Sequence, residues 1–492
     1  MPTDKTMTVS PLRQRVLNGA PVRPDGAFVL YWMVAARRAQ DNFALDRAVE
    51  LAAELRRPLL ILEALRCDYP HASDRLHTFV LEGMRDTARA VSDTPVGVTY
   101  RSYVEPHAGA GRGLVETLAA QACAVVTDDF PAFFLPRMVA AVGARLPVHA
   151  VAVDGFGLVP MRAVPKAMPS AAAFRHHVHA WVPSHPEDLP AAAPFERLRG
   201  LALPTLPRPP EAFAPRWDFG VPEGVAHLPI SHDVAPVARV GGSRAALARL
   251  AEFRRDGLPR YLEDRNHPDR DCTSGLSPYL HFGHISAHRV FSAVTQPSGW
   301  HPGLAQRAAK GRREGFWGLG PAEEAFVDQL VVWREVGANL CHYRPDTYAT
   351  LDGLPPWAQD TLRAHAGDTR AFLYEQRAFE AAATHDPLWN AAQRQLVREG
   401  RLHNYLRMLW GKKILEWSAS PADAMRVLVT LNDRYALDGR DPNSYCGIGW
   451  VLGRHDRPWP PERPVLGTLR PMSSDRTAAK VDVARFLRTF SP

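Results

Sequence analysis

The stretch AFVLYWMVA, residues 27–35, is the first of five strand-like runs in the N-terminal third of the chain. The other four are RPLLILEAL (57–65), VGVTYRSY (96–103), CAVVTDD (123–129) and PVHAVAVD (147–154). Helix-like stretches separate them, including FALDRAVELAAELR (43–56) and DRLHTFVLEGMRDTARAV (74–91). Strands that alternate with helices predict βαβ units and a parallel sheet. We therefore expect a Rossmann-like α/β domain over residues 25–160.

A glycine-rich piece, HAGAGRGLVETLAA (107–120), lies between two of these strands. It is similar to a nucleotide-binding loop, but it does not match the spacing G-x-G-x-x-G. We interpret it as a glycine turn that opens a helix.

Proline dominates the part of the chain that follows, as in PTLPRPPEAFAPRWDFGVPEG (204–224). Because proline interrupts helices and strands, regular structure cannot run for long here. We expect residues 161–240 to form a long linker between two domains. The histidines of FRHHVHAWVPSHP (174–186) have no acidic or cysteine partners at metal-ligand spacing, so we interpret them as surface or packing residues.

Helical periodicity dominates after residue 240. The expected helices lie at 243–256, 283–294, 322–341, 370–381, 389–417 and 421–436. The last one has a clear start, because Ser420 can cap it, Pro421 suits the first helical position and Asp423 complements the helix dipole. This pattern predicts an all-helical domain over residues 241–492.

The composition is that of a globular protein with a large core, since 46% of the 492 residues are hydrophobic and 23% are charged. No apolar run approaches the ~18 residues of a membrane span, and the start of the chain lacks the apolar region of a secretory signal. The five cysteines are scattered, which suits a reduced cytosol and indicates neither disulfides nor a metal site. We therefore expect a cytoplasmic protein. Its net charge of +7 permits a polyanionic partner.

The stretch HNYLRMLWGKKILEWSAS (403–420) gives one face of an expected helix an unusual composition. At about 100° per residue, four of its side chains share that face. They are Arg407, Trp410, Ile414 and Trp417. Such a face can be core, since tryptophan is mostly buried and arginine can cover it. It can also be a redox conduit, because the two indoles lie roughly 10 Å apart along the axis and rings at that spacing can relay an electron.

Two further segments carry polar groups with two interpretations each. In DCTSGLSPYLHFGHIS (271–286), hydroxyls and backbone N–H groups before a helix can cradle a phosphate, or they can form an ordinary capped turn. In LNDRYALDGRDPNSYCGIGW (431–450), carboxylates and amides surround an Asp-Gly turn. They can be acid/base groups or metal ligands, or they can form a self-bonded loop, whose aspartate side chains bond its own backbone. The polar residues of the second segment are Asn432, Asp433, Asp438, Asp441 and Asn443.

Together these segments resemble the DNA photolyase and cryptochrome family, and in particular its class II cyclobutane pyrimidine dimer photolyases. The resemblance is carried by YWMVAARRAQDNFAL, SGLSPYLHFGHISAHRV, THDPLWNAAQ, RMLWGKKILEW and LNDRYALDGRDPNSYCGIGW, with RHDRPW after them. It extends from about residue 28 to the C-terminus, and THDPLWN and KKILEW separate class II from class I enzymes and typical cryptochromes. It implies an N-terminal antenna domain and a C-terminal helical domain that holds a U-shaped FAD.

The resemblance also implies roles at the flavin. Arg407 and Asp438 would form an ion pair beside the isoalloxazine ring, and Asn432 would face its N5 atom, where an amide can donate or accept. The other implied FAD-binding residues are Tyr261, Thr273, Ser274, Gly275, Leu276, Ser277 and Asp433. An electron relay of class II type would run from Trp410, nearest the flavin, through Trp389 to Trp417 near solvent.

On the substrate side, Trp333 and Trp450 match aromatic residues that hold a flipped-out dimer, whose extrusion is needed because the reacting bonds are buried in the base stack. The remaining lesion-side contacts match Arg265, Asn266, Met408 and Arg457. The implied partner is UV-damaged DNA, double- or single-stranded, and we expect a monomer that binds no metal ion.

Three departures from the family pattern stand out. Ala35 and Ala36 replace an Arg-Asp pair in the first strand, which bears on the antenna chromophore, typically of the 8-hydroxy-5-deazaflavin type. An extra segment, GLAQRAAKGRREGFWGLGPAE (303–323), interrupts the usual spacing, and we interpret its basic residues as a solvated loop. The lesion-contacting glutamate, four residues before Trp333, is Gln329 here, yet we count it among the catalytic residues with the three relay tryptophans and Asn432.

The expected activity is light-dependent repair, in which excited reduced FAD donates an electron to a pyrimidine dimer, the ring splits and the electron returns. The alternative is a cryptochrome-like flavin photosensor with little or no repair activity. The substrate-side residues favour repair. A six-four photolyase would need an active-site histidine pair that the sequence does not place, and a dark flavin oxidoreductase would need a nicotinamide-binding fingerprint.

Overall fold

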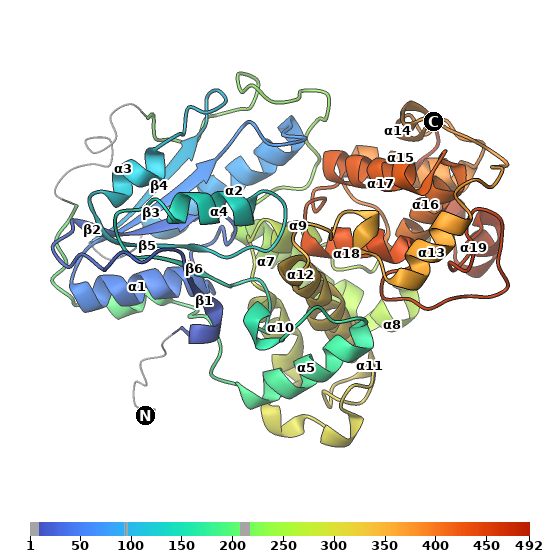
Figure 1. Cartoon of the computed structure of the whole chain (residues 1–492). Helices are drawn as coiled ribbons and strands as arrows, with labels where there is room; N and C mark the ends of the chain where they lie inside the picture. The colour runs from blue at the N-terminus through green and yellow to red at the C-terminus, as the bar shows by residue number, and fades with distance from the viewer. Residues whose placement is uncertain (1–8, 93, 95–96, 207–216) are drawn as a thin grey trace. The chain divides into compact units, whose positions relative to one another are not determined.

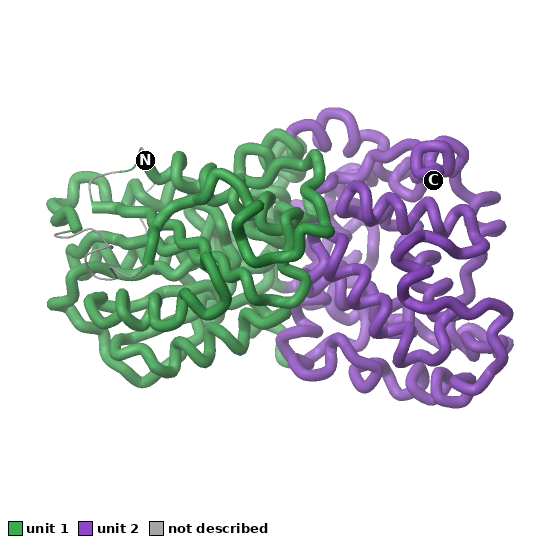
Figure 2. The backbone as a smooth tube through the Cα atoms, turned by 90° about the horizontal axis from the view of Figure 1, so that it is seen from above, with its two compact units in different colours: residues 1–165, 181–250, 276–303 green, residues 166–180, 251–275, 304–492 purple. Residues whose placement is uncertain are grey.

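The computed structural model describes residues 9–92, 94, 97–206 and 217–492. The chain divides into two compact units, each assembled from three segments of the sequence (Figure 2). Unit 1 comprises residues 1–165, 181–250 and 276–303, and unit 2 comprises residues 166–180, 251–275 and 304–492. Within the described residues, every helix is too short or too polar to cross a membrane.

A six-stranded sheet of order β1-β6-β5-β2-β3-β4 forms the centre of unit 1 (Figure 1). The strands are β1 (Gln14–Val16), β2 (Phe28–Met33), β3 (Leu59–Leu65), β4 (Val98–Val104), β5 (Ala122–Asp128) and β6 (Ala150–Val153). All neighbours are parallel except β1 and β6. The predicted parallel sheet is therefore confirmed. β1 was not predicted, because three residues are too few to show a periodic pattern.

Helices cover both faces of this sheet. The helix α1 (Phe43–Leu55) packs on the face that carries Val29, Tyr31 and Met33, whereas α3 (Leu114–Ala119) packs on the face that carries Phe28 and Leu30. Successive side chains of a strand point to opposite faces, so a strand covered on both sides is apolar throughout, as β2 is. The other helices with residues in unit 1 include α2 (Asp74–Ser92), α4 (Leu135–Gly143), α7 (Ser243–Glu252), α9 (Ser277–His281) and α10 (Ala287–Thr295).

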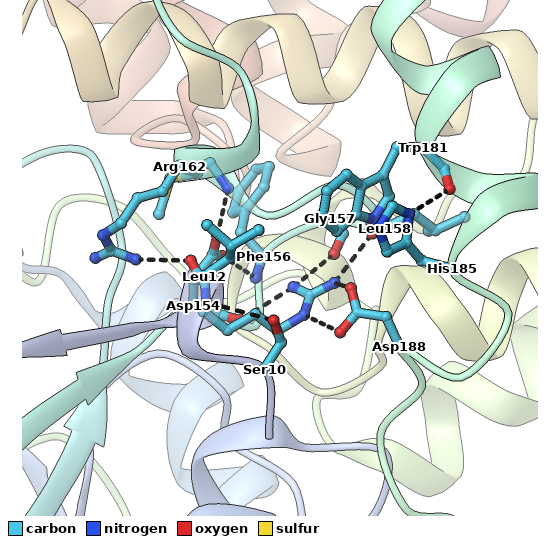
Figure 3. Close-up of polar contacts among 12 residues, drawn as sticks. Ser10, Leu12, Asp154, Phe156, Gly157, Leu158, Arg162, Trp181, His185 and Asp188 are labelled. Atoms are coloured by element: carbon cyan, nitrogen blue, oxygen red, sulfur yellow. Dashed lines mark hydrogen bonds and ion pairs between the residues drawn. The ribbon is translucent and has the colours of Figure 1, made fainter. Parts of the chain in front are cut away.

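A buried arginine directly before β1 contacts Asp154, Gly157, Leu158 and Asp188, which Figure 3 labels. The Arg13 guanidinium forms a two-bond ion pair with Asp188, at 2.9 and 2.8 Å. Its remaining N–H groups donate to the backbone carbonyls of Asp154, Gly157 and Leu158 at 3.0–3.2 Å. All five guanidinium donors are thus used, which offsets the cost of burying the charge.

Asp128, at the end of β5, fixes the loop that follows β2. Its Oδ2 accepts backbone N–H groups from Val34, Ala35 and Ala36 at 2.7–3.0 Å, and its Oδ1 accepts the Tyr31 hydroxyl at 2.8 Å. Because only the backbone of the two alanines takes part, this loop keeps its anchor without the Arg-Asp side chains that the resemblance leads us to expect.

Unit 2 is helical, as predicted for the C-terminal part. Its helices are α8 (Tyr261–Asp264), α11 (Pro321–Val327), α12 (Arg334–Tyr343), α13 (Pro356–Ala364), α14 (Gln376–Glu380), α15 (Pro387–Glu399), α16 (Asn404–Trp417), α17 (Pro421–Tyr435), α18 (Pro442–Val451), α19 (Ser474–Lys480) and α20 (Ala484–Thr489). Ser420 caps α17 as predicted, since its hydroxyl accepts the Asp423 N–H at 3.1 Å.

Several predicted helices have different bounds, and three of them differ most. The helix expected at 370–381 forms only as α14. The run at 389–417 is two helices, because Gly400 ends α15 with a φ of 65°, a left-handed conformation that suits glycine. The run at 322–341 is interrupted by a π-helical turn at Asp328–Trp333.

The histidine-rich stretch of the expected linker forms a regular helix, α5 (Ala171–Ser184). Its residue His179 is buried and stacks on Phe316, with 3.6 Å between the ring centroids. Residues 207–216 of the expected linker lie outside the described residues.

Candidate active site

Two packed helices of unit 2, α16 and α17, place Arg407 next to Asn432. Arg407 Nη1 donates to Asn432 Oδ1 at 3.2 Å, and Arg407 Nη2 lies 3.9 Å from Asp438 Oδ1. The Asn432 amide donates to the Gly439 carbonyl at 2.6 Å and to Asp433 Oδ1 at 3.1 Å. The arginine and the amide are therefore held in place, while the pairing of Arg407 with Asp438 is long.

A cavity lies beside these side chains; the empty space of about 320 Å³ in and around it includes open solvent, and its enclosed part is small. Arg407 and Asn432 supply its polar groups, and Trp410 supplies an aromatic ring. The rest of the lining is small or aliphatic: Leu396, Leu402, Leu428, Gly447, Ile448 and Val451. Apolar walls with a few convergent polar groups suit a flat ring system that has one hydrogen-bonding edge.

Asp433 is buried behind Asn432, and its partners come from the protein. Its carboxylate accepts the Tyr445 hydroxyl at 2.9 Å and the Asn432 amide at 3.1 Å. Burial in this apolar surrounding raises the pKa of Asp433 to about 6. These contacts make Asp433 a support for Asn432.

The nearby Asp441 is the N-cap of α18, because its Oδ1 accepts the Asn443 N–H at 2.9 Å. Of the interpretations considered for this segment, the self-bonded loop describes Asp441. Across the described parts of the chain, no cluster of three histidine, cysteine or acidic side chains could hold a metal ion.

The three tryptophans of the predicted relay lie together in the core of unit 2. The ring centroids of Trp389 and Trp417 are 6.0 Å apart. The Trp389 indole N–H donates to the Trp410 backbone carbonyl at 2.9 Å, and the Trp410 indole N–H donates to Gln393 Oε1 at 2.9 Å. Helices α15 and α16 thus bring together rings that are distant in the sequence.

The Trp417 side chain is buried, and the ring of the exposed His385 packs against it, with 4.8 Å between the ring centroids. Tyr374 packs against it edge-on, with 5.8 Å between the ring centroids. The Tyr374 hydroxyl is hydrogen-bonded to Nδ1 of the exposed His385 at 2.8 Å. Tyr374 and His385 thus both contact the Trp417 ring. Sequence reasoning did not single them out, because their contacts with Trp417 join segments that are distant in the sequence.

The two tryptophans expected to hold the lesion stack on each other. Trp333 and Trp450 have ring centroids 4.9 Å apart and planes 22° apart. Trp333 ends the π-helical turn, Trp450 lies near the end of α18, and both rings are partly exposed. They therefore present one continuous aromatic surface.

Gln329 lies on the same π-helical turn as Trp333 and is partly exposed. The neighbouring Asp328 does not replace the missing glutamate, because it forms a buried ion pair with Arg175, with 2.6 Å between Oδ1 and Nε. Glu335, two residues past Trp333, is buried on α12. Of these three side chains, Gln329 is the one that is partly exposed to solvent.

Most of the remaining predicted residues belong to unit 2. Thr273 donates to Asp271 at 2.8 Å and Gly275 has a φ of 62°, and the segment continues into unit 1 with Leu276 and Ser277. Tyr261 is buried, and the Arg265 guanidinium carbon lies 5.5 Å from the centroid of its ring. Burial raises the pKa of the Tyr261 hydroxyl to about 12. Asn266 is exposed and Met408 is partly exposed on α16.

Arg457 is exposed and stacks on an aromatic ring. Its guanidinium carbon lies 4.7 Å from the Trp459 ring centroid, and that of Arg470 lies 5.0 Å from the same ring. The Trp459 indole donates to Asp456 at 3.1 Å. This stack orders Arg457 at the surface, although the sequence singled out only the arginine.

Two more residues of the site were missed. Gln393 holds the Trp410 indole and lies four residues after Trp389, a spacing that places both on one helix face. Lys412 is buried and donates to the Val451 carbonyl, the last residue of α18. A buried lysine in a helix rich in polar residues gives no signal in the sequence.

No protein-family model matches the chain. The chain is 35% identical to the deoxyribodipyrimidine photo-lyase of Methanothermobacter thermautotrophicus over 465 residues, which cover 94% of each chain. It is 34% identical to the deoxyribodipyrimidine photo-lyase of Potorous tridactylus over 480 residues, 95% of this chain and 81% of the relative. Its fold is similar to that in the crystal structure of a class III photolyase from Agrobacterium tumefaciens, with a TM-score of 0.67 and 19% sequence identity. The match covers 94% of this chain and 86% of the other.

The arrangement of a mostly parallel sheet and a helical part is therefore the photolyase fold. By its similarity to relatives along nearly their whole length, the chain belongs to the deoxyribodipyrimidine photo-lyase family.

Proposed function

We propose that this protein repairs cyclobutane pyrimidine dimers in DNA by a light-driven electron transfer, as a class II photolyase. The observation that carries the proposal is the identity of about a third with relatives named deoxyribodipyrimidine photo-lyase, over nearly the whole of both chains. In this reaction an electron enters the dimer, two carbon–carbon bonds of the cyclobutane ring break, and the electron leaves again. No net oxidation or reduction results.

The side chains that line the cavity in unit 2 are of the kinds that would suit the ring system of FAD. Its aliphatic walls suit the faces of an isoalloxazine, and Arg407 and Asn432 would meet its polar edge. The FAD phosphates would be held by the segment from Thr273 to Ser277, with Tyr261 nearby. When bound, FAD would supply light absorption and one-electron chemistry. Asp433 and Gly439 would fix the orientation of the Asn432 amide toward it.

The tryptophans would supply electrons that keep the cofactor reduced. The indole N–H groups of Trp389 and Trp410 donate to amide oxygens, which are very weak bases. An indole that loses an electron therefore keeps its proton at Nε1, so the charge can move on to the next ring. Burial of all three rings excludes the water that would otherwise accept this proton.

On the substrate side, the partly exposed surface of Trp333 and Trp450 would stack against an extruded dimer. Arg265, Asn266 and Met408 would contact the lesion, and Arg457, ordered by Trp459, would fill the space left in the duplex. Gln329 would donate an amide N–H to a dimer carbonyl. Phosphate contacts from arginine and lysine would make the affinity fall with salt.

Two further points of this proposal are a monomeric protein and an antenna chromophore of the 8-hydroxy-5-deazaflavin type. An absorption spectrum of the purified protein reports the flavin and the antenna together, and light scattering reports the mass. A second absorbing species besides flavin is the expected spectrum. A spectrum of flavin alone would contradict the antenna and leave the repair proposal standing.

The test of function uses an oligonucleotide with a single thymine dimer and protein with chemically reduced flavin. We expect the dimer to be converted to thymines in light and not in darkness. No conversion, despite bound reduced flavin and bound lesion, would contradict the repair proposal and favour a photosensor.

A further inference from the structure

The segment that is extra relative to the family pattern forms a loop of defined structure in unit 2. We call residues 304–320 the basic loop. Its aromatic residues Phe316 and Trp317 are buried. Phe316 stacks on His179 of α5, and the Gly311 N–H donates to His179 Nδ1 at 3.1 Å. Burial and nearby cations lower the pKa of His179 to about 3, so this acceptor stays neutral at physiological pH.

A buried carboxylate fixes the other end of the basic loop. Glu324 on α11 accepts the N–H groups of Trp317 at 2.9 Å and Gly318 at 3.1 Å, and also that of Gly315. Gly315 and Gly318 have φ values of 77° and 67°, which only glycine adopts readily. The loop is therefore anchored at both ends by buried contacts.

The outer side of the basic loop carries four cations within seven residues. They are Arg307, Lys310, Arg312 and Arg313, and all four are exposed. Among the residues that the structure describes, these side chains have no ion-pair partner. Some exposed arginines elsewhere in the chain are paired, as Arg363 is with Asp360 and Arg426 with Asp423. The loop thus keeps a concentrated positive charge on a fixed backbone.

We propose that the basic loop binds the phosphate backbone of duplex DNA outside the lesion, extending the contact surface beyond the dimer pocket. The charge matches a polyanion, and the anchored backbone reduces the conformational entropy lost on binding. This inference rests on the proposed function, since it takes damaged DNA as the partner. It replaces the interpretation of the segment as a merely solvated loop.

The test compares the flavin-loaded protein with the variant R307Q/K310Q/R312Q/R313Q. Binding to a long dimer-containing duplex is measured against salt. We expect roughly tenfold weaker binding at low salt, and a salt slope lower by about one for each phosphate that the variant no longer neutralises. The effect should vanish when the duplex is shortened to the bases around the dimer, and repair of that short duplex should be unchanged.

A matched control removes four exposed cations that are already paired, in R145Q/R199Q/R363Q/R426Q. The same decrease in net charge should leave the salt slope nearly unchanged. An equal effect of both variants, or no effect of the first, would overturn the proposal. The proposal would also be overturned if the loop variant lost binding to vesicles of phosphatidylcholine with phosphatidylserine but kept its binding to DNA. Absence of repair by the unaltered protein would instead contradict the proposed function.

Discussion

Gln329 differs from the glutamate of the family by one titratable proton. A glutamine amide can donate to a dimer carbonyl at any pH, whereas a glutamate can donate only when protonated. We therefore predict that Gln329→Glu raises the repair yield and makes it depend on pH, while the natural protein shows a nearly flat profile. The measurement is dimers repaired per absorbed photon with reduced flavin, from about pH 5 to about pH 9. A steep profile in the natural protein would assign the proton donor to another residue.

Asp433 should make stability depend on pH in an unusual direction. Its pKa is about 6 in the folded protein, above the 3.8 of the unfolded chain, because burial penalises its charge. As pH falls from 6 to 3.8, the folded state takes up a proton that the unfolded state lacks, so this group then favours folding. Above pH 6 the folded state carries the full penalty, on the order of 3 kcal/mol.

We predict that Asp433→Asn gains stability relative to the natural protein as pH rises from about 4 to about 7, by up to ~3 kcal/mol. Urea unfolding of both proteins at the two pH values measures this difference. A difference that does not change with pH would show that Asp433 remains ionised in the folded protein.

Replacement of Trp389 by phenylalanine should interrupt the supply of electrons. Phenylalanine keeps much of the packing but is far harder to oxidise, and it cannot donate to the Trp410 carbonyl as the indole does. We expect loss of flavin photoreduction, with normal flavin content and normal repair by chemically reduced protein. Trp317→Phe is the matched control, because this indole is equally buried but belongs to the basic loop. Normal photoreduction in Trp389→Phe would remove this residue from the relay.

At the scale of elements, the anchoring of the basic loop by Glu324 can be tested directly. Each hydrogen bond from a backbone N–H group to a charged carboxylate contributes roughly 1.5–3 kcal/mol, and Glu324 accepts three of them. We predict that Glu324→Ala speeds hydrogen exchange at Gly315, Trp317 and Gly318 by at least about tenfold. The amides of α17 should keep their natural rates. Unchanged exchange in the loop would mean that the aromatic contacts alone hold it.

The sequence predicted the elements wherever the period was long and regular. The strands β2 to β6 and the helix α17 were found because short apolar runs and a serine cap are local signals. The break at Gly400 and the π-helical turn before Trp333 were missed. Both depend on hydrogen bonds of single turns, which leave the apolar spacing of the neighbouring helices intact.

The candidate site was predictable in part for a similar reason. Trp410 and Trp417 share a helix face by spacing alone, whereas Trp389 joined them only through the family resemblance. Gln393, Tyr445 and Tyr374 take part through contacts between elements far apart in the sequence. Such contacts depend on the packing of unit 2, which a local pattern does not contain.

At the scale of the whole molecule, affinity and lesion preference should be separable. Phosphate contacts carry no information about damage, whereas stacking on the extruded dimer does. We predict that Trp450→Ala lowers the preference for damaged over intact duplex but leaves the salt slope unchanged. Binding of both duplexes across a salt series measures the two quantities. Equal weakening for both DNAs would place Trp450 outside the lesion pocket.

The interleaving of the two units along the chain has a consequence for biosynthesis. Unit 1 draws its last segment from residues 276–303, after the chain has already contributed two segments to unit 2. A ribosome that has released only the first 165 residues has therefore delivered the whole sheet but not the helices α7, α9 and α10. The last of these helices is delivered only when about three fifths of the message has been translated, so chaperone binding to the incomplete unit 1 should persist through that interval. No single cut in the gene would separate the two units, because residues 166–180 and 251–275 of unit 2 lie between segments of unit 1.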